Sequence, residues 1–514
     1  MLSDIKICAL FLLSAVIAGA EVKPASLFSD HAVLQSGMSV PVWGTAAAGE
    51  KVTVAINGVS ASATAGADGR WMVRLKKLKA GGPFEMTIAG SNTVTVKDVL
   101  VGEVWLGSGQ SNMVFTISKK NNPLAGMQDE EKVIAEASCP QIRMFTGKAT
   151  KSYEPQQTIE GEWKLCTPEN AGGFSAVGYL FARDLQRELK VPVGIVLEAY
   201  GASTAESWLP RETVAADPLL KPRLEAFDSR VTYFRAHAGA TNAGAPPAPQ
   251  TINGRAQSAN GPLRDPVQDQ HEPTVLYNGM IAPVLPYAIR GILWYQGESI
   301  IGGRHGVEVY PHTMETLVKE WRARWGEGEL PFFFVQLAAL DNVSNNPAVR
   351  EAQAQLLKLP NTAMAVTIDI GDETNVHPKN KAPLGERLMA IALAKTYGRK
   401  AEYTGPVYDS MKIEGCNATI RFTHAAGLMA KGGAPAEFEI AGADQNFAPA
   451  NAMVAGDTIV VSSPQVAAPV AVRYAWKDYP KGANLYNAAG LPAAPFRTDS
   501  WDALTSSAAR FTGK

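Results

Sequence analysis

The chain has 514 residues, more than a single hydrophobic core usually serves, so two or three domains are expected. Hydrophobic residues make up 46% of it and charged residues 19%, a composition typical of a well-packed globular protein and not of a disordered or fibrous one. The formal net charge is −1, and no run of Lys and Arg stands out. Nucleic acid and anionic membrane surfaces are therefore not expected as partners, because both bind clustered basic side chains.

The first 20 residues are typical of a secretory signal peptide. Lys6 precedes an apolar run over residues 7–18, and Ala18-Gly19-Ala20 supplies the small residues of a cleavage site. We therefore expect a mature chain that starts at Glu21 and is exported to the periplasm or the extracellular space. The apolar run is too short to span a bilayer, and no membrane span is expected elsewhere.

Three cysteines follow the expected signal peptide: Cys139, Cys166 and Cys416. They show neither the CxxC nor the Cys/His spacing of a metal site, so we expect no metal and no other cofactor. A Cys139–Cys166 disulfide and three reduced cysteines are both compatible with the sequence. Nothing in the sequence indicates an oligomeric state.

Residues 21–97 are predicted to form a small β-sandwich. Val52, Val54 and Ile56 alternate with polar partners, which is the pattern of a strand with one buried face. Asn57-Gly58 follows directly, and this dipeptide favours a tight hairpin turn.

Residues 98–400 are predicted to form an α/β domain with a parallel sheet covered by helices on both faces. Short, nearly all-apolar runs alternate there with amphipathic helical segments, as such a sheet requires. Long loops are expected at residues 114–174 and 237–272, and either could border a substrate groove. The predicted strands are Val99–Leu106, Val193–Ala199, Gly291–Tyr295, Phe332–Leu337 and Ala363–Ile368.

Alternating strands return in residues 401–480, separated by turns rich in Gly, Pro and Asp. We interpret this segment as a second, C-terminal β-module. Residues 481–514 read as a loop-like tail, which we expect to pack on the α/β domain.

The first predicted strand of the α/β domain ends in Gly107-Ser108-Gly109-Gln110-Ser111. Two glycines allow a sharp turn that would expose the hydroxyl of Ser111, while backbone N–H groups around it face a developing oxyanion. A Gly-x-Ser by itself is more often an ordinary turn, so the other strand ends must decide.

Chemically useful residues recur directly after the other predicted strands. Gly201 offers an unobstructed backbone N–H and Gln296 a side-chain amide, which together with the Ser111 N–H could bind an oxyanion. In an open α/β sheet the carboxyl ends of the parallel strands lie at one edge, and ligands bind just outside that edge. The presence of such residues at several strand ends therefore favours Ser111 as a nucleophile. The last predicted strand is followed by a possible base and possible orienting carboxylates: His377, Asp369 and Asp372.

Three motifs resemble those of the sialate O-acetylesterase family: Gly109-Gln110-Ser111-Asn112-Met113, Trp294-Tyr295-Gln296-Gly297-Glu298, and Ile368-Asp369-Ile370-Gly371-Asp372 followed by His377-Pro378-Lys379-Asn380. That family belongs to the SGNH/GDSL-like hydrolases and includes bacterial carbohydrate acetylesterases. The resemblance covers most of the mature chain. It implies a flavodoxin-like SGNH catalytic domain, no metal, and removal of O-acetyl groups from sugars.

By position, the resemblance makes Ser111 the nucleophile, His377 the base, and Gly201 and Gln296 the oxyanion positions. Glu298 is expected to orient Gln296 or a substrate hydroxyl more than to act as a base, since His377 already supplies one. The polar residues expected to support these groups or to bind substrate are Gln110, Asn112 and Glu298.

The chain departs from the family at three places. Gly201-Ala202 stands where many members have Gly-Gly, and Ile300 stands where members often carry Asn. SGNH enzymes commonly have Asp three residues before the histidine, but Thr374 is there, and Asn375 stands where relatives often have Asp.

The residue that orients His377 is therefore left open between Asp372, Asp369 and a backbone carbonyl near Asn375. We favour Asp372, because it follows Gly371 at the strand end, where the chain can turn back towards the imidazole.

Together these observations predict a serine esterase that removes O-acetyl groups from carbohydrate through an acetyl-enzyme intermediate. Its substrate would be sialic acid or a plant polysaccharide such as xylan or xyloglucan. The alternative is a non-catalytic glycan-binding protein on an esterase scaffold, favoured only by the missing aspartate. Arg304 and Arg350 could each contact a sugar carboxylate, although an arginine near a helix start is more often a solvated or structural contact.

Overall fold

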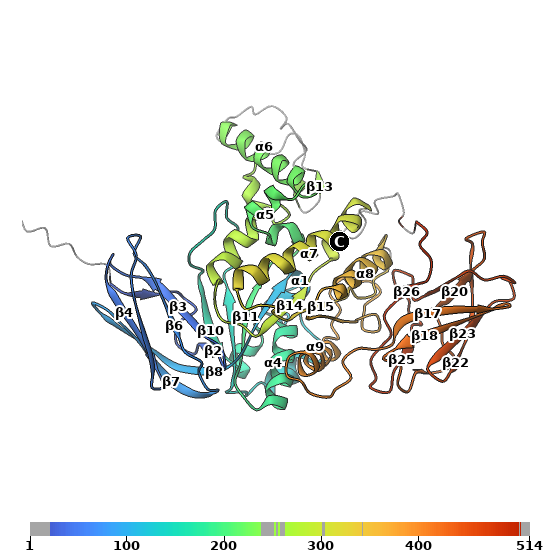
Figure 1. Ribbon diagram of the computed structural model, residues 1–514, viewed down its shortest axis with the longest axis horizontal. Coiled ribbons are helices and arrows are strands. Elements are labelled where there is room, and N and C mark those ends of the chain that lie inside the picture. The colour runs from blue at the N-terminus through green and yellow to red at the C-terminus, as the bar shows by residue number, and fades with distance from the viewer. Residues whose placement is uncertain are drawn as a thin grey trace, which may run out of the picture.

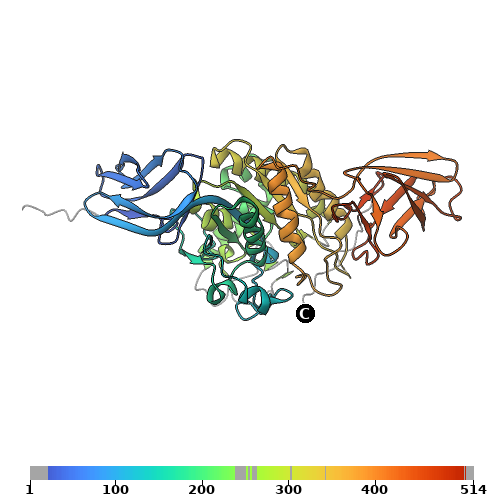
Figure 2. The same cartoon turned by 90° about the horizontal axis from the view of Figure 1, so that it is seen from below.

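The computed structural model describes residues 21–237, 251–252, 255–256, 263–300, 304–341, 343–502 and 504. A central α/β domain lies between two β-modules, one at each end of the molecule (Figures 1 and 2). The expected signal peptide and most of the expected loop at 237–272 lie outside the described residues.

The N-terminal module contains two sheets. Val52, Val54 and Ile56 are fully buried, because the alternating pattern turns every second side chain inward. The hairpin after Ile56 places Asn57 at φ 48° and Gly58 at φ 74°, as a primed turn requires. The strands are β1 (Lys23–Pro24), β2 (Val33–Gln35), β3 (Val40–Thr45), β4 (Lys51–Ile56), β5 (Val59–Thr64), β6 (Arg70–Leu75) and β7 (Gly81–Ala89).

Strand β8 (Thr93–Gly109) is shared by the N-terminal module and the central domain. Its first part pairs with β7 and β2, and its last part pairs in parallel with β11 (Val193–Ala199) and β14 (Gly291–Tyr295). The module border expected at Asp98 thus falls within one continuous strand. This strand carries the chain straight to Ser111.

The central sheet has the strand order β10-β9-β11-β8-β14-β15-β16. All neighbours are parallel except β10 (Gly161–Leu165), which pairs antiparallel with β9 (Ile142–Gly147) at one edge. The predicted strands are all present, but β15 (Phe332–Val335) and β16 (Thr362–Ala365) end earlier than predicted. The apolar residues that follow them are buried in strand-end loops, which apolarity alone cannot distinguish from strands.

Helices cover both faces of this sheet. On one face α4 (Ala176–Leu189) packs against α9 (Ala382–Lys395) over a core that includes Leu293 and Tyr295. On the other, α7 (Arg304–Trp325) and α8 (Asn346–Ala354) share a core with Ile292 and Trp294. The remaining helices are α1 (Ser111–Val114), α2 (Glu130–Ala135), α3 (Pro168–Ala171), α5 (Arg211–Ala216) and α6 (Lys221–His237).

Single-turn helices lie at Ala205–Trp208, Pro266–Gln268, Tyr277–Ile281, Ala282–Val284, Glu298–Ile300 and Gln355–Lys358, and a two-stranded pair is formed by β12 (Thr251–Ile252) and β13 (Arg255–Ala256). Within the described residues, no helix is long and apolar enough to cross a membrane. Cys139, Cys166 and Cys416 are all free thiols.

The C-terminal module has two four-stranded sheets and a two-stranded one, and residues of the expected tail take part in them. Tyr486 donates from its hydroxyl to Asp369 of the central domain at 3.1 Å, and Arg497 pairs with Glu351 at 2.8 Å. The strands are β17 (Val407–Glu414), β18 (Asn417–Thr423), β19 (Met429–Ala430), β20 (Phe438–Ala441), β21 (Phe447–Pro449), β22 (Asn451–Ala455), β23 (Thr458–Ser462), β24 (Ala471–Tyr474), β25 (Leu485–Tyr486) and β26 (Phe496–Arg497).

Arg350 joins the C-terminal module to the central sheet. Its guanidinium is fully buried and donates to the carbonyl oxygens of Leu337 and Ala338 on one side and of Lys477 and Asp478 on the other, at 2.8–3.1 Å. Burial lowers the pKa of Arg350 to about 9. Since its donors are occupied by backbone oxygens, Arg350 serves the fold and is not available to a sugar carboxylate.

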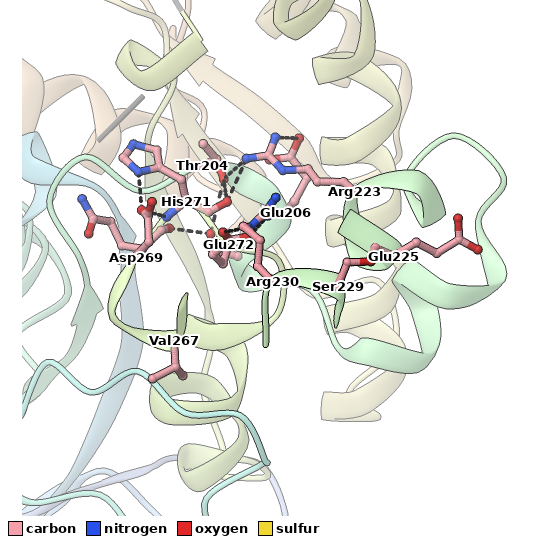
Figure 3. A network of polar contacts seen from close by, with 12 residues as sticks. Thr204, Glu206, Arg223, Glu225, Ser229, Arg230, Val267, Asp269, His271 and Glu272 are labelled. Carbon is pink, nitrogen blue, oxygen red and sulfur yellow. Dashed lines mark hydrogen bonds and ion pairs between the residues drawn. The ribbon is translucent and has the colours of Figure 1, made fainter. Parts of the chain in front are cut away.

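Helices α5 and α6 project from the central domain on the side where the strands end (Figure 1). A polar network anchors α6 to the segments next to the sheet (Figure 3). Arg230 pairs with Glu272 at 2.5 Å, and Arg223 pairs with Glu206 at 3.1 Å. Because Glu206 closely follows β11, this projection is tied to the carboxyl end of that strand.

Candidate active site

Ser111 is the first residue of α1 and directly follows the turn at the end of β8. It is partly exposed, whereas Gln110 and Asn112 on either side are buried. Gly109 has φ 129°, and a Cβ atom there would lie 2.1 Å from the carbonyl oxygen of Tyr295. The turn therefore requires glycine, and it leaves Ser111 partly exposed at the carboxyl end of β8.

Gly201 lies against the nucleophile candidate. A Cβ atom built on Gly201 would stand 3.7 Å from the Cβ atom of Ser111, so the ends of β11 and β8 meet at these two residues. The next residue, Ala202, has φ 55°. This is the left-handed region, which costs a non-glycine residue about 1–2 kcal/mol.

Gln296 is fully buried at the end of β14. Its Nε2 donates to the carbonyl oxygen of Ser203 at 3.1 Å, and its Oε1 accepts from the hydroxyl of Tyr310 at 3.0 Å. These contacts fix which end of the amide faces the β11 turn. A primary amide nitrogen carries two hydrogens, so one donor remains beyond Ser203.

Gln110 holds two strand ends together. Its Oε1 accepts hydrogen bonds from the backbone N–H of Gly297 at 3.2 Å and of Ser299 at 3.4 Å. The side chain next to the nucleophile candidate therefore fixes the loop that carries Gln296 and Glu298.

His377 lies on the loop that follows β16. Asn112 donates from Nδ2 to the carbonyl oxygen of Val376 at 3.0 Å, so this loop is attached to the residue after Ser111. The imidazole centroid lies 6.3 Å from that of Phe115. Burial, and then the positive charge of Lys381, lower the pKa of His377 to about 4, so the ring is neutral at neutral pH.

The Nε2 atom of His377 is buried and has no hydrogen-bond partner within the described residues. It is therefore not hydrogen-bonded to Ser111 in this structure. Such a separation is common for a nucleophile and its base, because catalytic hydrogen bonds often tighten only when substrate binds.

Within the described part of the chain, the hydrogen bonds and ion pairs of the two acidic residues of the last motif go to groups other than the imidazole. Oδ1 of Asp372 accepts from the backbone N–H groups of Thr374 and Asn375, both at 2.9 Å. Asp369 pairs with both terminal nitrogens of Arg387, at 2.8 and 2.7 Å. Asn375 in turn accepts from the backbone N–H of His377 at 2.9 Å, so Asp372 reaches His377 only through its loop.

Sequence reasoning missed Lys381. This residue is only 1% exposed, and its Nζ donates to Oδ1 of Asn112 at 2.6 Å. It is the N-cap of α9, where the helix dipole disfavours a cation. A lysine four residues after a candidate base was the available signal.

A parallel sheet with these polar groups gathered at the carboxyl ends of its strands defines an α/β enzyme. Among the described residues, no cluster of three or more His, Cys, Asp or Glu side chains is arranged to hold a metal ion. A family model described as "Carbohydrate esterase, sialic acid-specific acetylesterase" matches residues 267–395, which include Gln296, His377 and Lys381.

Similarity to known proteins extends over nearly the whole chain. Sialate O-acetylesterase from Rattus norvegicus is 30% identical over 93% of this chain and 94% of its own length. The Homo sapiens protein of the same name is 28% identical, over 93% of each chain. The crystal structure of a carbohydrate acetylesterase from Xanthomonas citri matches with a TM-score of 0.79 and 36% identity, covering 93% of this chain and 100% of that one.

The chain belongs to the sialate O-acetylesterase family and is a carbohydrate esterase. The family resemblance inferred from the three motifs is thereby confirmed.

Proposed function

We propose that this protein is an exported serine esterase that removes O-acetyl groups from carbohydrate through an acetyl-enzyme intermediate, on an SGNH-type domain. The observation that carries the proposal is the position of Ser111, which lies against Gly201 and is tied through Asn112 to the residue before His377. The order β11-β8-β14-β15-β16 supports the fold assignment, because it corresponds to the flavodoxin-like order 2-1-3-4-5.

In the proposed reaction, Ser111 Oγ attacks the acetyl carbonyl carbon while His377 takes the hydroxyl proton. The backbone N–H groups of Ser111 and Gly201 and the Nε2 of Gln296 stabilise the oxyanion. The intermediate collapses, and the sugar oxygen leaves with the proton from His377. The base then activates water, which attacks the acetyl group and releases acetate and free Ser111.

The neutral state of His377 suits this role, since a base must be unprotonated before it can accept the serine proton. We propose that Asp372 acts on the loop and not on the ring, because its carboxylate is used by Thr374 and Asn375. Ser111 and His377 would then work as a dyad supported by the fold.

The proposed substrates are O-acetylated sialic acid and acetylated plant polysaccharide such as xylan or xyloglucan. The first follows the name of the rat and human relatives. The second falls within the wider class, carbohydrate, that the name of the Xanthomonas citri protein gives. Acetate release from a panel of these glycans distinguishes them. Release from sialic acid alone, or from xylan and xyloglucan alone, assigns the substrate class.

Replacement of Ser111 tests the mechanism. Ser111→Ala should abolish hydrolysis of p-nitrophenyl acetate, with a loss of about 10⁶-fold in kcat and an unchanged melting temperature. Ser410→Ala in the C-terminal module is the control and should leave kcat at the wild-type value. A Ser111→Ala variant that keeps more than a few per cent of kcat would rule out Ser111 as the nucleophile. A wild-type protein that binds acetylated glycan without turnover would instead be a glycan-binding protein.

Export is tested separately by N-terminal sequencing of the protein recovered from its source. A chain that begins at Glu21 would support export, and one that retains residues 1–20 would contradict it.

A further inference from the structure

We propose that Lys381 is a positioning residue for the reaction: with Asn112 and Glu298 it forms a buried bridge that fixes the Ser111 turn against the His377 loop. This inference rests on the proposed function, because it takes Ser111 and His377 as nucleophile and base. It adds a residue that no sequence motif assigned to the site.

Both the oxygen and the nitrogen of the Asn112 side-chain amide take part in the bridge. Oδ1 of Asn112 accepts from Nζ of Lys381 at 2.6 Å, and Nδ2 donates to Oε1 of Glu298 at 2.5 Å and to the carbonyl oxygen of Val376 at 3.0 Å. Asn112 is only 1% exposed. Since the amide oxygen meets a donor and the amide nitrogen meets two acceptors, its orientation is fixed.

These contacts join parts of the chain that are far apart in sequence. Asn112 belongs to α1, Glu298 to the turn after β14, and Lys381 to the start of α9. Ser111 is covalently next to the centre of the bridge, and His377 is next to Val376. Loss of the bridge would therefore let the nucleophile and the base move relative to each other.

The bridge also carries compensating charges in a buried place. The Nζ of Lys381 lies 4.8 Å from the ring centroid of Phe115 and 5.3 Å from that of Tyr295, so aromatic faces surround the ammonium. Burial lowers the pKa of Lys381 to about 7, while the charge of Glu298 acts in the opposite direction. Burial raises the pKa of Glu298, and Lys381 opposes that rise. The ammonium of Lys381 and the carboxylate of Glu298 thus stabilise each other's charged form, and the Asn112 amide lies between them.

The charges near His377 make its protonation sensitive to Lys381. Burial of the phenols raises the pKa of Tyr295 and of Tyr310, so both stay neutral and Glu298 is the counter-charge in the bridge. On the His377 loop itself, Asp372 binds Thr374 and Asn375, and Glu373 faces Lys481 at 3.7 Å. Lys379 on the same loop is exposed. Lys381 is therefore the buried cation that opposes protonation of the imidazole.

Two substitutions separate position from charge. Lys381→Met removes both the hydrogen bond to Asn112 and the charge, whereas Lys381→Gln keeps a donor but no charge. We expect Lys381→Met to lower kcat by about 10²-fold with little change in KM, as misplacement of reacting groups does. Lys381→Gln should recover part of that loss. In both variants the acid limb of kcat/KM should move to higher pH, and Lys379→Met should match the wild type.

The imidazole can also be followed without activity. NMR titration of His377 in the Ser111→Ala background should give a higher pKa when Lys381→Gln is added, and melting temperatures report whether each variant is folded. If Lys381→Met does not fold, Lys381→Gln decides. An unchanged kcat, or an unshifted acid limb and imidazole titration in folded Lys381→Gln, would overturn the inference. Full activity of Ser111→Ala would instead overturn the proposed mechanism, while the titration would still report on Lys381.

Discussion

Asn112 donates a 3.0 Å hydrogen bond from its side-chain nitrogen to the backbone carbonyl oxygen of Val376. The two residues are 264 positions apart in the chain, yet one follows Ser111 and the other precedes His377. A polar contact between distant parts of the chain therefore ties the turn of the proposed nucleophile to the loop of the proposed base.

Gln296→Ala should lower kcat by about 10²–10³-fold with little effect on KM, because an oxyanion donor acts mainly in the transition state. Steady-state kinetics on p-nitrophenyl acetate measure both constants. Gln465→Ala, an exposed glutamine of the C-terminal module, is the matched control. An effect on KM alone would assign Gln296 to substrate binding.

Asp372→Asn should cost less than about tenfold in kcat, since the asparagine oxygen can still accept from Thr374 and Asn375. A triad aspartate changed to asparagine typically costs about 10⁴-fold. A loss of that size would show that Asp372 acts directly on the imidazole. Asp369→Asn is the comparison: it should lower the melting temperature, because it weakens the pair with Arg387.

The pH dependence of kcat/KM should show an acid limb near pH 4. The pKa of His377 is lowered to about 4 by burial and Lys381, so the imidazole is mostly neutral at pH 5 and mostly protonated below about pH 4. Because the unfolded state takes up this proton near pH 6.5, His377 should also reduce the unfolding free energy as pH falls from about 6.5 to 4. An acid limb near 6.5 would show that the imidazole is not shielded as described.

Ala202→Gly should stabilise the fold by about 1 kcal/mol, because it removes the cost of an alanine at φ 55°. Chemical denaturation measures the change. Ala199→Gly, within strand β11, is the control and should destabilise, since glycine gains freedom in the unfolded state without relieving any strain. Equal destabilisation by both substitutions would mean that the left-handed turn carries no such cost.

The sequence alone predicted the strands of the central sheet and the candidate site residues that follow them. Strands Val193–Ala199 and Gly291–Tyr295 were predicted with their observed bounds, because a parallel strand buried on both faces leaves a short, unbroken apolar run. The sequence also predicted that Ser111 and Gly201 lie close together, since parallel strands bring their carboxyl ends to one edge of the sheet.

Only the tertiary structure decided how the polar side chains are paired. Asn112 meets Lys381 across 269 positions of sequence, and Asp372 turns its carboxylate to its own loop and not to the imidazole. Arg350 likewise uses backbone carbonyls of two domains, so it serves the fold and binds no ligand carboxylate. Apolar periodicity reports which face of an element is buried. The partner of a buried polar group depends instead on which distant segments the packed core brings within hydrogen-bonding distance, and no local pattern records that.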